Sequence, residues 1–399
     1  MFSISIVGAG IGGLSAAIAL ARDGHQVTVY EATEPSKIGA GVQISPNAVR
    51  IWLSWGLAEA LRSVALSPTS LQLRRWDNGR LLARTMLDKW EQRFKAPYLV
   101  LHRADLYRVL FAHATGLGVT VCAGCRVVAY DIDTPTLRLH TGETIAPDLI
   151  LAIDGLHSSA RAQLSEKRPC PSGIAAYRLI VPVEAVRADP QTAWIASSRD
   201  LNLWVGESCS AMAYMIRNHT QLNLVLSHPD THLSSPSQQG LTKEMEQYFG
   251  NWDTRLMDIV RKQESIQNWP LYQIALDSWL APSGRFMILG DAAHGMLPYL
   301  SMDYQGISMA VEDAAAVAIA LKTVDDARNI YSVLRPIEIS RMQRTARVQE
   351  ASEQAAAVLH LPDGPEQEAR DEAMGEKREY SPYGMCDYET QEWCYGYQA

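Results

Sequence analysis

The sequence predicts an α/β fold with two interleaved parts, a parallel-sheet domain and a mostly antiparallel β-sheet domain, followed by C-terminal helices. Residues 3–32 have the pattern of a strand, a glycine-rich turn, a helix and a second strand. Two apolar segments run into Asp154 and Asp291, and the first is wholly apolar, as in a buried parallel strand. Alternating residues without helical rhythm fill 174–226, which indicates antiparallel strands.

The glycine-rich turn has the spacing of a dinucleotide-binding motif. Gly8, Gly10 and Gly13 stand as GxGxxG between a strand and an Ala/Leu-rich helix. Gly8 can make the tight turn, Gly10 lets a pyrophosphate approach the backbone, and Gly13 lets the helix lie close to the sheet. Glu31 ends the next strand, where its carboxylate can accept hydrogen bonds from a ribose diol. Because this charge disfavours a 2′-phosphate, FAD and NAD remain as ligands.

The other elements follow from apolar periodicity and turn residues. In chain order they are a helix at 45–55, a hairpin over 71–85, a helix from Arg103, short strands over 119–151, alternating strands over 174–226, helices over 242–263, and long helices over 307–322 and 325–359. Gly39 and Gly41 indicate either backbone pressed against a ligand or a plain turn. The tail from Pro362 is acidic and then rich in Tyr, Trp and Cys, and it is able to dock on the body.

Composition and charge exclude several classes of partner. The 399-residue chain has a formal net charge of −8, which does not favour nucleic acid. Its apolar runs are shorter than the ~20 residues of a membrane span. We therefore expect a soluble, cytoplasmic protein that is a monomer or a homodimer. Cys122 and Cys125 form a lone CxxC without further metal ligands nearby, so we expect two small residues beside a turn and no metal site.

Three separated motifs together resemble one family. They are Gly8 to Gly13 with Glu31, Asp154-Gly-x-x-Ser-x-x-Arg161, and Gly290-Asp-Ala-Ala-His294 followed by Pro298 and Gln305-Gly306. In this order they look like the FAD-dependent aromatic hydroxylases of the salicylate and para-hydroxybenzoate hydroxylase type, including fungal secondary-metabolism relatives. The resemblance covers residues 1 to about 350.

The resemblance and the interrupted parallel sheet define the expected domains. A Rossmann-like FAD-binding domain is interleaved with a substrate-binding, mostly antiparallel β-sheet domain, and C-terminal helices with a tail follow. The expected boundaries are 1–72, 98–172 and 270–325 for the FAD-binding domain, 73–97 and 173–269 for the substrate domain, and 326–399 for the C-terminal part.

The resemblance also implies contacts with FAD. Glu31 would hold the adenosine ribose, Arg103 would approach the pyrophosphate or ribityl region, and Asp291 would accept hydrogen bonds from ribityl hydroxyls. The Gly306-Ile307 backbone would face the flavin pyrimidine, and the segment from Asp154 to Arg161 would contact both FAD and NAD(P)H. Physical chemistry agrees, because a carboxylate at the end of an apolar strand is costly unless hydroxyls saturate it. Amides at the start of a helix also stabilise the anion of reduced flavin.

Two of these assignments have an alternative. Asp291 could serve as a helix cap. His294 is a candidate general base, but in the family this histidine belongs to the flavin-binding turn, and its geometry decides between the two readings.

Arg178 and Tyr214 are the candidate catalytic residues. Arg178 lies in an otherwise apolar strand, where a guanidinium is costly unless an anion meets it. In the fungal relatives the arginine of this Tyr-Arg pair is placed to hold a substrate phenolate, and Tyr214 corresponds to a substrate-pocket tyrosine. The alternatives are that Arg178 pairs with a structural carboxylate and that Tyr214 is core packing.

The resemblance implies a class A flavin monooxygenase. NADPH or NADH would reduce bound FAD as a transient reductant, since no second GxGxxG exists in the chain. O2 would add at flavin C4a, and the hydroperoxide would hydroxylate, epoxidise or dearomatise an aromatic or other electron-rich molecule, such as a polyketide or alkaloid ring.

The flavin loop departs from the family pattern. Met302-Asp303-Tyr304 looks like an insertion, and Ser308 stands where many relatives have asparagine. The alternatives are therefore an FAD-fold protein that catalyses a non-redox isomerisation or cyclisation, and a non-catalytic flavin-binding protein.

Overall fold

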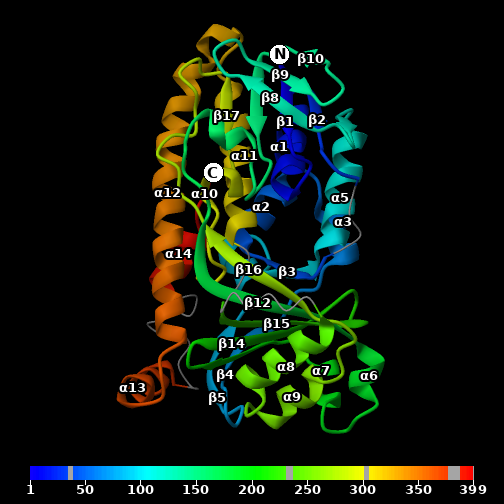
Figure 1. Cartoon of the computed structure of the whole chain (residues 1–399), viewed down its shortest axis with the longest axis vertical. Helices are drawn as coiled ribbons and strands as arrows, with labels where there is room; N and C mark the ends of the chain where they lie inside the picture. Colours follow the sequence, from blue (N-terminus) through cyan, green and yellow to red (C-terminus); the bar gives the residue numbers. More distant parts are fainter. Residues whose placement is uncertain (35–38, 231–236, 301–304, 376–386, 399) are drawn as a thin grey trace.

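The computed structural model describes residues 1–34, 39–230, 237–300, 305–375 and 387–398. The insertion predicted at 302–304 lies outside the described residues. Figure 1 shows an elongated molecule in which the N-terminal parallel sheet occupies one end and a large antiparallel sheet the other. The predicted α/β fold with an interleaved antiparallel sheet is confirmed.

A five-stranded parallel sheet forms the first layer, in the order β17-β11-β1-β2-β7. Its strands are β1 (Ser3–Val7), β2 (Gln26–Tyr30), β7 (Thr120–Cys122), β11 (Leu149–Ala152) and β17 (Phe286–Ile288). Because β17, β11 and β1 are parallel neighbours, their carboxyl ends meet at one edge. The glycine turn, Asp154 and Asp291 therefore emerge side by side.

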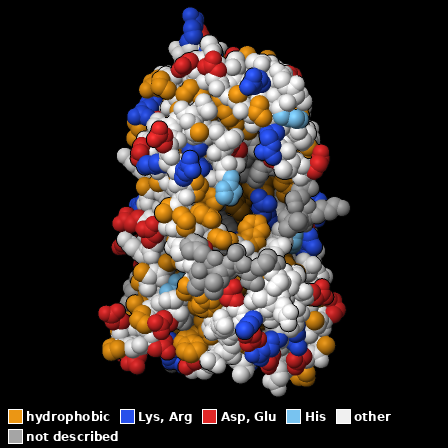
Figure 2. All heavy atoms as spheres, viewed as in Figure 1, with side chains coloured by type: hydrophobic (Ala, Val, Ile, Leu, Met, Phe, Trp, Pro, Cys, Tyr) orange, Lys and Arg blue, Asp and Glu red, His pale blue; other side chains and the backbone are white. Residues whose placement is uncertain are grey.

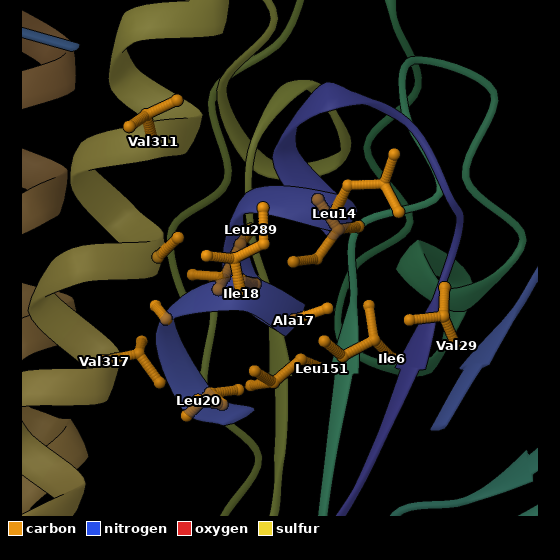
Figure 3. Close-up of a cluster of buried hydrophobic side chains, with 14 of the residues drawn as sticks. Ile6, Leu14, Ala17, Ile18, Leu20, Val29, Leu151, Leu289, Val311 and Val317 are labelled. Carbon is orange, nitrogen blue, oxygen red and sulfur yellow. The ribbon is translucent and has the colours of Figure 1, made fainter. Parts of the chain in front are cut away.

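The helix α1 (Ile11–Arg22) lies between the sheet and α11 (Gln305–Leu321). Figure 3 shows Ala17 and Leu20 of α1 beside Ile6 and Leu151 of the sheet, with Val311 and Val317 on α11. Each fully buried leucine or isoleucine contributes about 1.5–3 kcal/mol to this core. A Cβ on Gly12 would lie 3.0 Å from the Ala310 Cβ, so small residues let the two helices approach closely.

Smaller elements lie around the parallel sheet and between it and the antiparallel sheet. They are the helices α2 (Pro46–Ser54), α3 (Ala58–Val64), α4 (Trp90–Phe94), α5 (Arg103–Gly116) and α10 (Asp291–His294), the antiparallel pair β3 (Gly41–Ile44) and β6 (Leu99–His102), and the sheet of β8 (Val127–Asp131), β9 (Thr136–Leu139) and β10 (Thr144–Ile145). Cys122 and Cys125 are free thiols beside a turn, as the sequence predicts.

The second domain is a seven-stranded sheet in the order β16-β12-β15-β14-β13-β4-β5. Its strands are β4 (Ser70–Arg75), β5 (Leu81–Met86), β12 (Cys170–Pro182), β13 (Leu201–Gly206), β14 (Cys209–Ile216), β15 (Gln221–Pro229) and β16 (Gln267–Gln273). All neighbours are antiparallel except the parallel pair β13 and β4, so the predicted mostly antiparallel sheet and its 71–85 hairpin are confirmed. Strands β4, β12 and β16 cross the boundaries expected at 72, 172 and 269, and those boundaries stay a proposal.

Helices cover one face of this sheet. They are α6 (Val183–Arg187), α7 (Ala193–Ala196), α8 (Gln238–Phe249) and α9 (Thr254–Val260). The helices α6 and α7 lie in a region where only strands and turns were expected, so that reading was wrong there. Pro182 ends β12 because it has no N–H for a ladder, and the Glu-Ala-Val segment after it favours a helix.

The long helix α12 (Ile330–Leu359) connects the two ends of the molecule (Figure 1). Leu334 packs in the cluster under the parallel sheet, whereas Val348 packs in the cluster against the antiparallel sheet. The helices α13 (Pro365–Met374) and α14 (Tyr388–Tyr395) follow, and α14 docks against α2. Within the described ranges, no helix is both long enough and apolar enough to cross a membrane.

Candidate functional site

The glycine turn has the geometry of a phosphate cradle. Gly8 has φ +101°, and a Cβ on it would lie 2.5 Å from the Ile153 carbonyl oxygen. A Cβ on Gly13 would lie 1.9 Å from the Gly8 carbonyl oxygen, so the first turn of α1 sits directly on the loop. A Cβ on Gly10 would meet no heavy atom within 4 Å. The free amides at the start of α1 therefore face open space, where an anion is stabilised.

Glu31 holds this turn in place. Its Oε2 accepts a hydrogen bond from the Ala9 N–H at 2.8 Å, and its Oε1 accepts from the Thr33 N–H at 2.9 Å. The carboxylate therefore lies next to the glycine turn, where a group that binds the ribose of a dinucleotide is expected. The contact with Ala9 is a positioning role that the sequence did not reveal.

Asp154 follows β11 and lies next to the glycine turn, since its Cα is 3.0 Å from the Cβ position of Gly8. Its Oδ2 accepts from the Ser159 N–H at 2.9 Å, and its Oδ1 is buried without a hydrogen-bond partner among the described residues. An unmet buried carboxylate oxygen is costly, so a ligand donor fits there. Arg161, by contrast, donates to the carbonyl oxygens of Ala292 and Leu156 and ties this turn to the Asp291 turn.

Asp291 begins α10 directly after β17. Its side chain is accessible to solvent, but many protein atoms lie around it. A Cβ on Gly306 would lie 3.0 Å from the Asp291 Oδ1. The close surroundings raise the pKa of Asp291, while His294 and Arg103 oppose that rise. No hydrogen bond from a described residue reaches this carboxylate, so hydroxyl donors of a ligand fit it better than the helix-cap reading.

His294 is fully buried and engaged by protein. Its Nε2 lies 2.6 Å from Oδ2 of Asp313, which also accepts from the Gly290 N–H at 3.2 Å. Burial alone would raise the pKa of Asp313, but His294 and Arg341 lower it to about 2. This geometry favours the reading of His294 as part of the turn over the reading as a general base.

Arg178 lies on β12 and Tyr214 on β14, the two strands that flank β15 in the antiparallel sheet. The Arg178 guanidinium is 5.3 Å from the centre of the Trp269 ring, and burial lowers the pKa of Arg178 to about 10. Arg178 therefore stays charged at neutral pH. Burial raises the pKa of the Tyr214 hydroxyl, which is 1% exposed. The positive charge of Arg103, at the start of α5, lowers the pKa of both Arg178 and Asp291, so this charge acts on site residues of both sheets.

Gly41 is pressed against protein side chains. Its N–H donates to the Asn223 Oδ1 at 2.7 Å, and a Cβ on it would lie 2.8 Å from the Tyr214 hydroxyl. Packing on the antiparallel sheet therefore explains the glycine, and contact with a cofactor there stays a prediction. The Asn223 Nδ2 is buried without a hydrogen-bond partner in the described ranges, and the sequence carried no signal for this residue.

These residues converge on one part of the molecule. Figure 2 shows a hollow between the two ends, with hydrophobic, basic and histidine side chains around it. In the described part of the chain no group of three His, Cys, Asp or Glu residues is placed to hold a metal ion. The glycine turn, Asp154 and Asp291 supply amides and carboxylates in a line, which fits a long ligand that carries phosphates and hydroxyls.

Comparison with known proteins agrees with this geometry. A family model described as FAD binding domain matches residues 1–354. The FAD-dependent monooxygenase OpS4 of Beauveria bassiana (strain ARSEF 2860) is 37% identical over 410 residues, which cover 99% of this chain and 94% of the relative. The 3-amino-4-hydroxybenzoate 2-monooxygenase PtmB3 of Streptomyces platensis is 33% identical and covers 99% of this chain and 96% of the relative. The solved structure of FqzB is 28% identical with a TM-score of 0.80, over 93% of this chain and 86% of that chain.

The fold and the site define a flavin-dependent monooxygenase of the aromatic hydroxylase type. The chain belongs to the FAD binding domain family, and the resemblance drawn from three separated motifs is confirmed.

Proposed function

We propose that the protein is a class A flavin monooxygenase that uses NADPH or NADH and O2 to hydroxylate, epoxidise or dearomatise an aromatic or other electron-rich molecule. The observation that carries this proposal is the convergence of the site. Gly10, Asp154 and Asp291 follow neighbouring parallel strands, and the charge of Arg103 lowers the pKa of both Asp291 and Arg178, which supports one site shared by the two sheets.

The residues of the parallel sheet suit FAD. The open amides near Gly10 would hold the pyrophosphate, Glu31 the adenosine ribose, and Asp291 the ribityl hydroxyls. The Gly306-Ile307 backbone starts α11 next to Asp291 and would face the flavin ring. Bound FAD would supply electron transfer from the nicotinamide and oxygen activation at C4a.

The residues of the antiparallel sheet suit an anionic ring. A charged Arg178 beside the Trp269 ring offers both a cation and an apolar face. The name of the relative PtmB3 indicates a hydroxylated aromatic acid as its substrate. We therefore propose a phenol or aromatic acid for this chain, with a polyketide or alkaloid ring as a larger variant of that class.

Arg178 would act by favouring the ionised substrate. A positive charge near a phenol lowers the pKa of that phenol, and the ring becomes richer in electrons. The Tyr214 hydroxyl would orient the ring oxygen, and the closed surroundings would exclude water from the reacting carbon.

The first experiment screens phenolic ligands for faster bleaching of the flavin by NADPH or NADH under anaerobic conditions. We expect at least one phenol or aromatic acid to accelerate reduction and to appear as an oxygenated product when O2 is admitted. If the yellow protein is never bleached with any ligand, the proposal fails and a non-redox or non-catalytic flavoprotein is the better reading.

The residue test is Arg178→Gln. Loss of the cation should lower kcat/KM by ~100-fold, since a charge-assisted contact with a developing anion contributes about 2.7 kcal/mol or more. The control is Arg84→Gln, an exposed arginine on the outer strand of the same sheet, which should leave the rates unchanged. A shift of the pH profile to higher pH in the Arg178 variant would mark lost stabilisation of a phenolate, whereas equal rates in both variants would contradict the role.

A further inference from the structure

The last helix, α14, is held to the body by arginines. Arg344 donates through Nη1 to the Trp393 carbonyl oxygen and through Nη2 to the Cys394 carbonyl oxygen, both at 2.7 Å. Carbonyl groups in the last turn of a helix lack partners within the helix, and cations there also complement the helix dipole. Arg93 holds the outer side of α14 through Gln391 and Glu392 at 2.6 and 2.8 Å.

Arg344 is also part of a buried ionic cluster. Its Nη2 donates to Oε1 of Glu312 at 3.0 Å, and the Nη1 of Arg341 donates to Oε2 of the same carboxylate at 2.6 Å. Arg341 reaches Oδ1 of Asp313 at 2.8 Å. The negative charges of two carboxylates and the positive charges of two guanidinium groups therefore compensate each other in the interior. Removal of one member would leave an uncompensated buried charge.

One branch of this cluster leads to the start of α11. The Asn47 Nδ2 donates to Glu312 at 2.7 Å, and the Ser45 hydroxyl donates to the Asn47 Oδ1 at 2.6 Å. The Ser45 Oγ accepts from the Gln305 Nε2 at 3.1 Å and lies 2.9 Å from the Ser308 Oγ. Gln305 and Ser308 flank Gly306 in the first turn of α11.

A second branch leads to the turn that carries Asp291. Asp313 accepts from the Gly290 N–H and pairs with His294, so it holds both ends of α10. The arginine that fixes α14 is therefore linked through Glu312 and Arg341 to both segments that border the Asp291 carboxylate. Every side chain along these branches is buried.

We infer that docking of α14 and binding of FAD are energetically coupled through this cluster, with Arg344 and Glu312 as positioning residues. When α14 is docked, its carbonyl oxygens accept the hydrogen bonds of Arg344, and Arg344 in turn keeps the Glu312 side chain in place. Glu312 then positions the first turn of α11 and the Asp291 turn, where the flavin end of FAD would lie. Coupling between two sites is reciprocal, so FAD must stabilise the docked helix by the same factor by which the docked helix strengthens FAD binding.

The first test measures the FAD dissociation constant of the full-length chain by quenching of flavin fluorescence. Arg344→Gln should weaken FAD binding by ~10-fold or more, within the usual range of coupling between sites. Arg93→Gln loosens α14 without touching Glu312, and it should weaken binding by a smaller factor of roughly 3 to 5. The matched control is Arg138→Gln, because Arg138 is exposed on β9, in a small sheet that lies away from α14 (Figure 1).

The second test measures hydrogen exchange of the α14 amides with and without FAD. Saturating FAD should slow this exchange in the wild type and in Arg138→Gln, and the slowing should be smaller in the other two variants. Thermal unfolding of each apoprotein shows whether a variant folds. If Arg344→Gln does not fold, the comparison of Arg93→Gln with the wild type tests the coupling. The inference is overturned if Arg93→Gln binds FAD like the wild type, or if FAD leaves exchange in α14 unchanged.

Discussion

Single glycines in the first turn should separate folding from FAD binding. Gly10 has φ −68° and ψ −177°, which alanine adopts without strain, and its Cβ position is open. Gly10→Ala should therefore unfold within about 0.5 kcal/mol of the wild type. Its FAD affinity should fall ~10-fold or more because the methyl group takes the space of a phosphate.

Urea unfolding and FAD titration check this prediction together. Gly116→Ala is the control, since Gly116 lies in α5 with no heavy atom within 4 Å of its Cβ position; its FAD affinity should stay at the wild-type value, and its stability should rise by at most about 1 kcal/mol. Normal FAD binding by Gly10→Ala would show that the pyrophosphate lies elsewhere.

The pair of Asp313 and His294 should contribute strongly to stability. Asp313→Asn leaves Arg341 and His294 facing a neutral group in a buried site, and we expect a loss of about 3–5 kcal/mol in the free energy of unfolding. The exposed pair of Lys167 and Asp277 offers the comparison, and Asp277→Asn should cost less than about 1 kcal/mol. Equal losses in urea unfolding would contradict the importance of burial.

The same carboxylate predicts a pH dependence. The folded protein lowers the pKa of Asp313 from 3.8 to about 2, so its contribution is complete above pH 3.8 and is lost as the pH falls toward 2. The stability difference between the wild type and Asp313→Asn should therefore be constant from pH 7 to pH 5 and shrink below pH 4. A difference that grows on acidification would contradict this assignment.

Two hairpin turns allow backbone strain to be separated from a steric clash. Gly142 and Gly79 both have positive φ, but a Cβ on Gly142 would meet nothing within 4 Å, whereas one on Gly79 would lie 1.9 Å from the Asp253 Oδ2. Gly142→Ala should cost about 1–2 kcal/mol for its backbone conformation alone. Gly79→Ala should cost about 2 kcal/mol more, because Asp253 also accepts from the Trp204 indole N–H at 3.0 Å. Matching losses in thermal unfolding would show that Asp253 moves freely.

The elements that could be predicted from the sequence are those with a local pattern. The β1, α1 and β2 segments carry their glycine spacing and apolar periodicity within 3–32, and the 71–85 hairpin is signalled by Asp77-Asn78-Gly79. The helices α6 and α7 are too short for a period to show, and strands were expected there.

The buried cluster could not be predicted for a different reason. Ser45 and Ser308 are separated by 263 residues and Asn47 and Glu312 by 265, so only the folded chain shows that they pair. The three motifs proposed to hold the parts of FAD could be recognised in the sequence because each is compact. Their convergence follows from the parallel order of β17, β11 and β1.

At the scale of the whole molecule, the proposed substrate would lie between two sheets of different kinds. The parallel sheet gathers backbone amides and carboxylates at the carboxyl ends of its strands, whereas the antiparallel sheet carries Arg178 and Tyr214 on the two strands that flank β15. The helix α12 packs on both ends and so connects the cores of the two sheets. A site divided in this way suits a long cofactor that meets a small ring at one end.

The most direct test of the central claim follows the source of the oxygen. The purified chain with its FAD is supplied with NADPH or NADH, a phenolic acid that accelerates flavin bleaching, and oxygen gas labelled with ¹⁸O. The account predicts one labelled oxygen atom in the product, detected by mass spectrometry, with one nicotinamide oxidised for each product formed. A product that carries no label, or that forms without oxidation of nicotinamide, would contradict it.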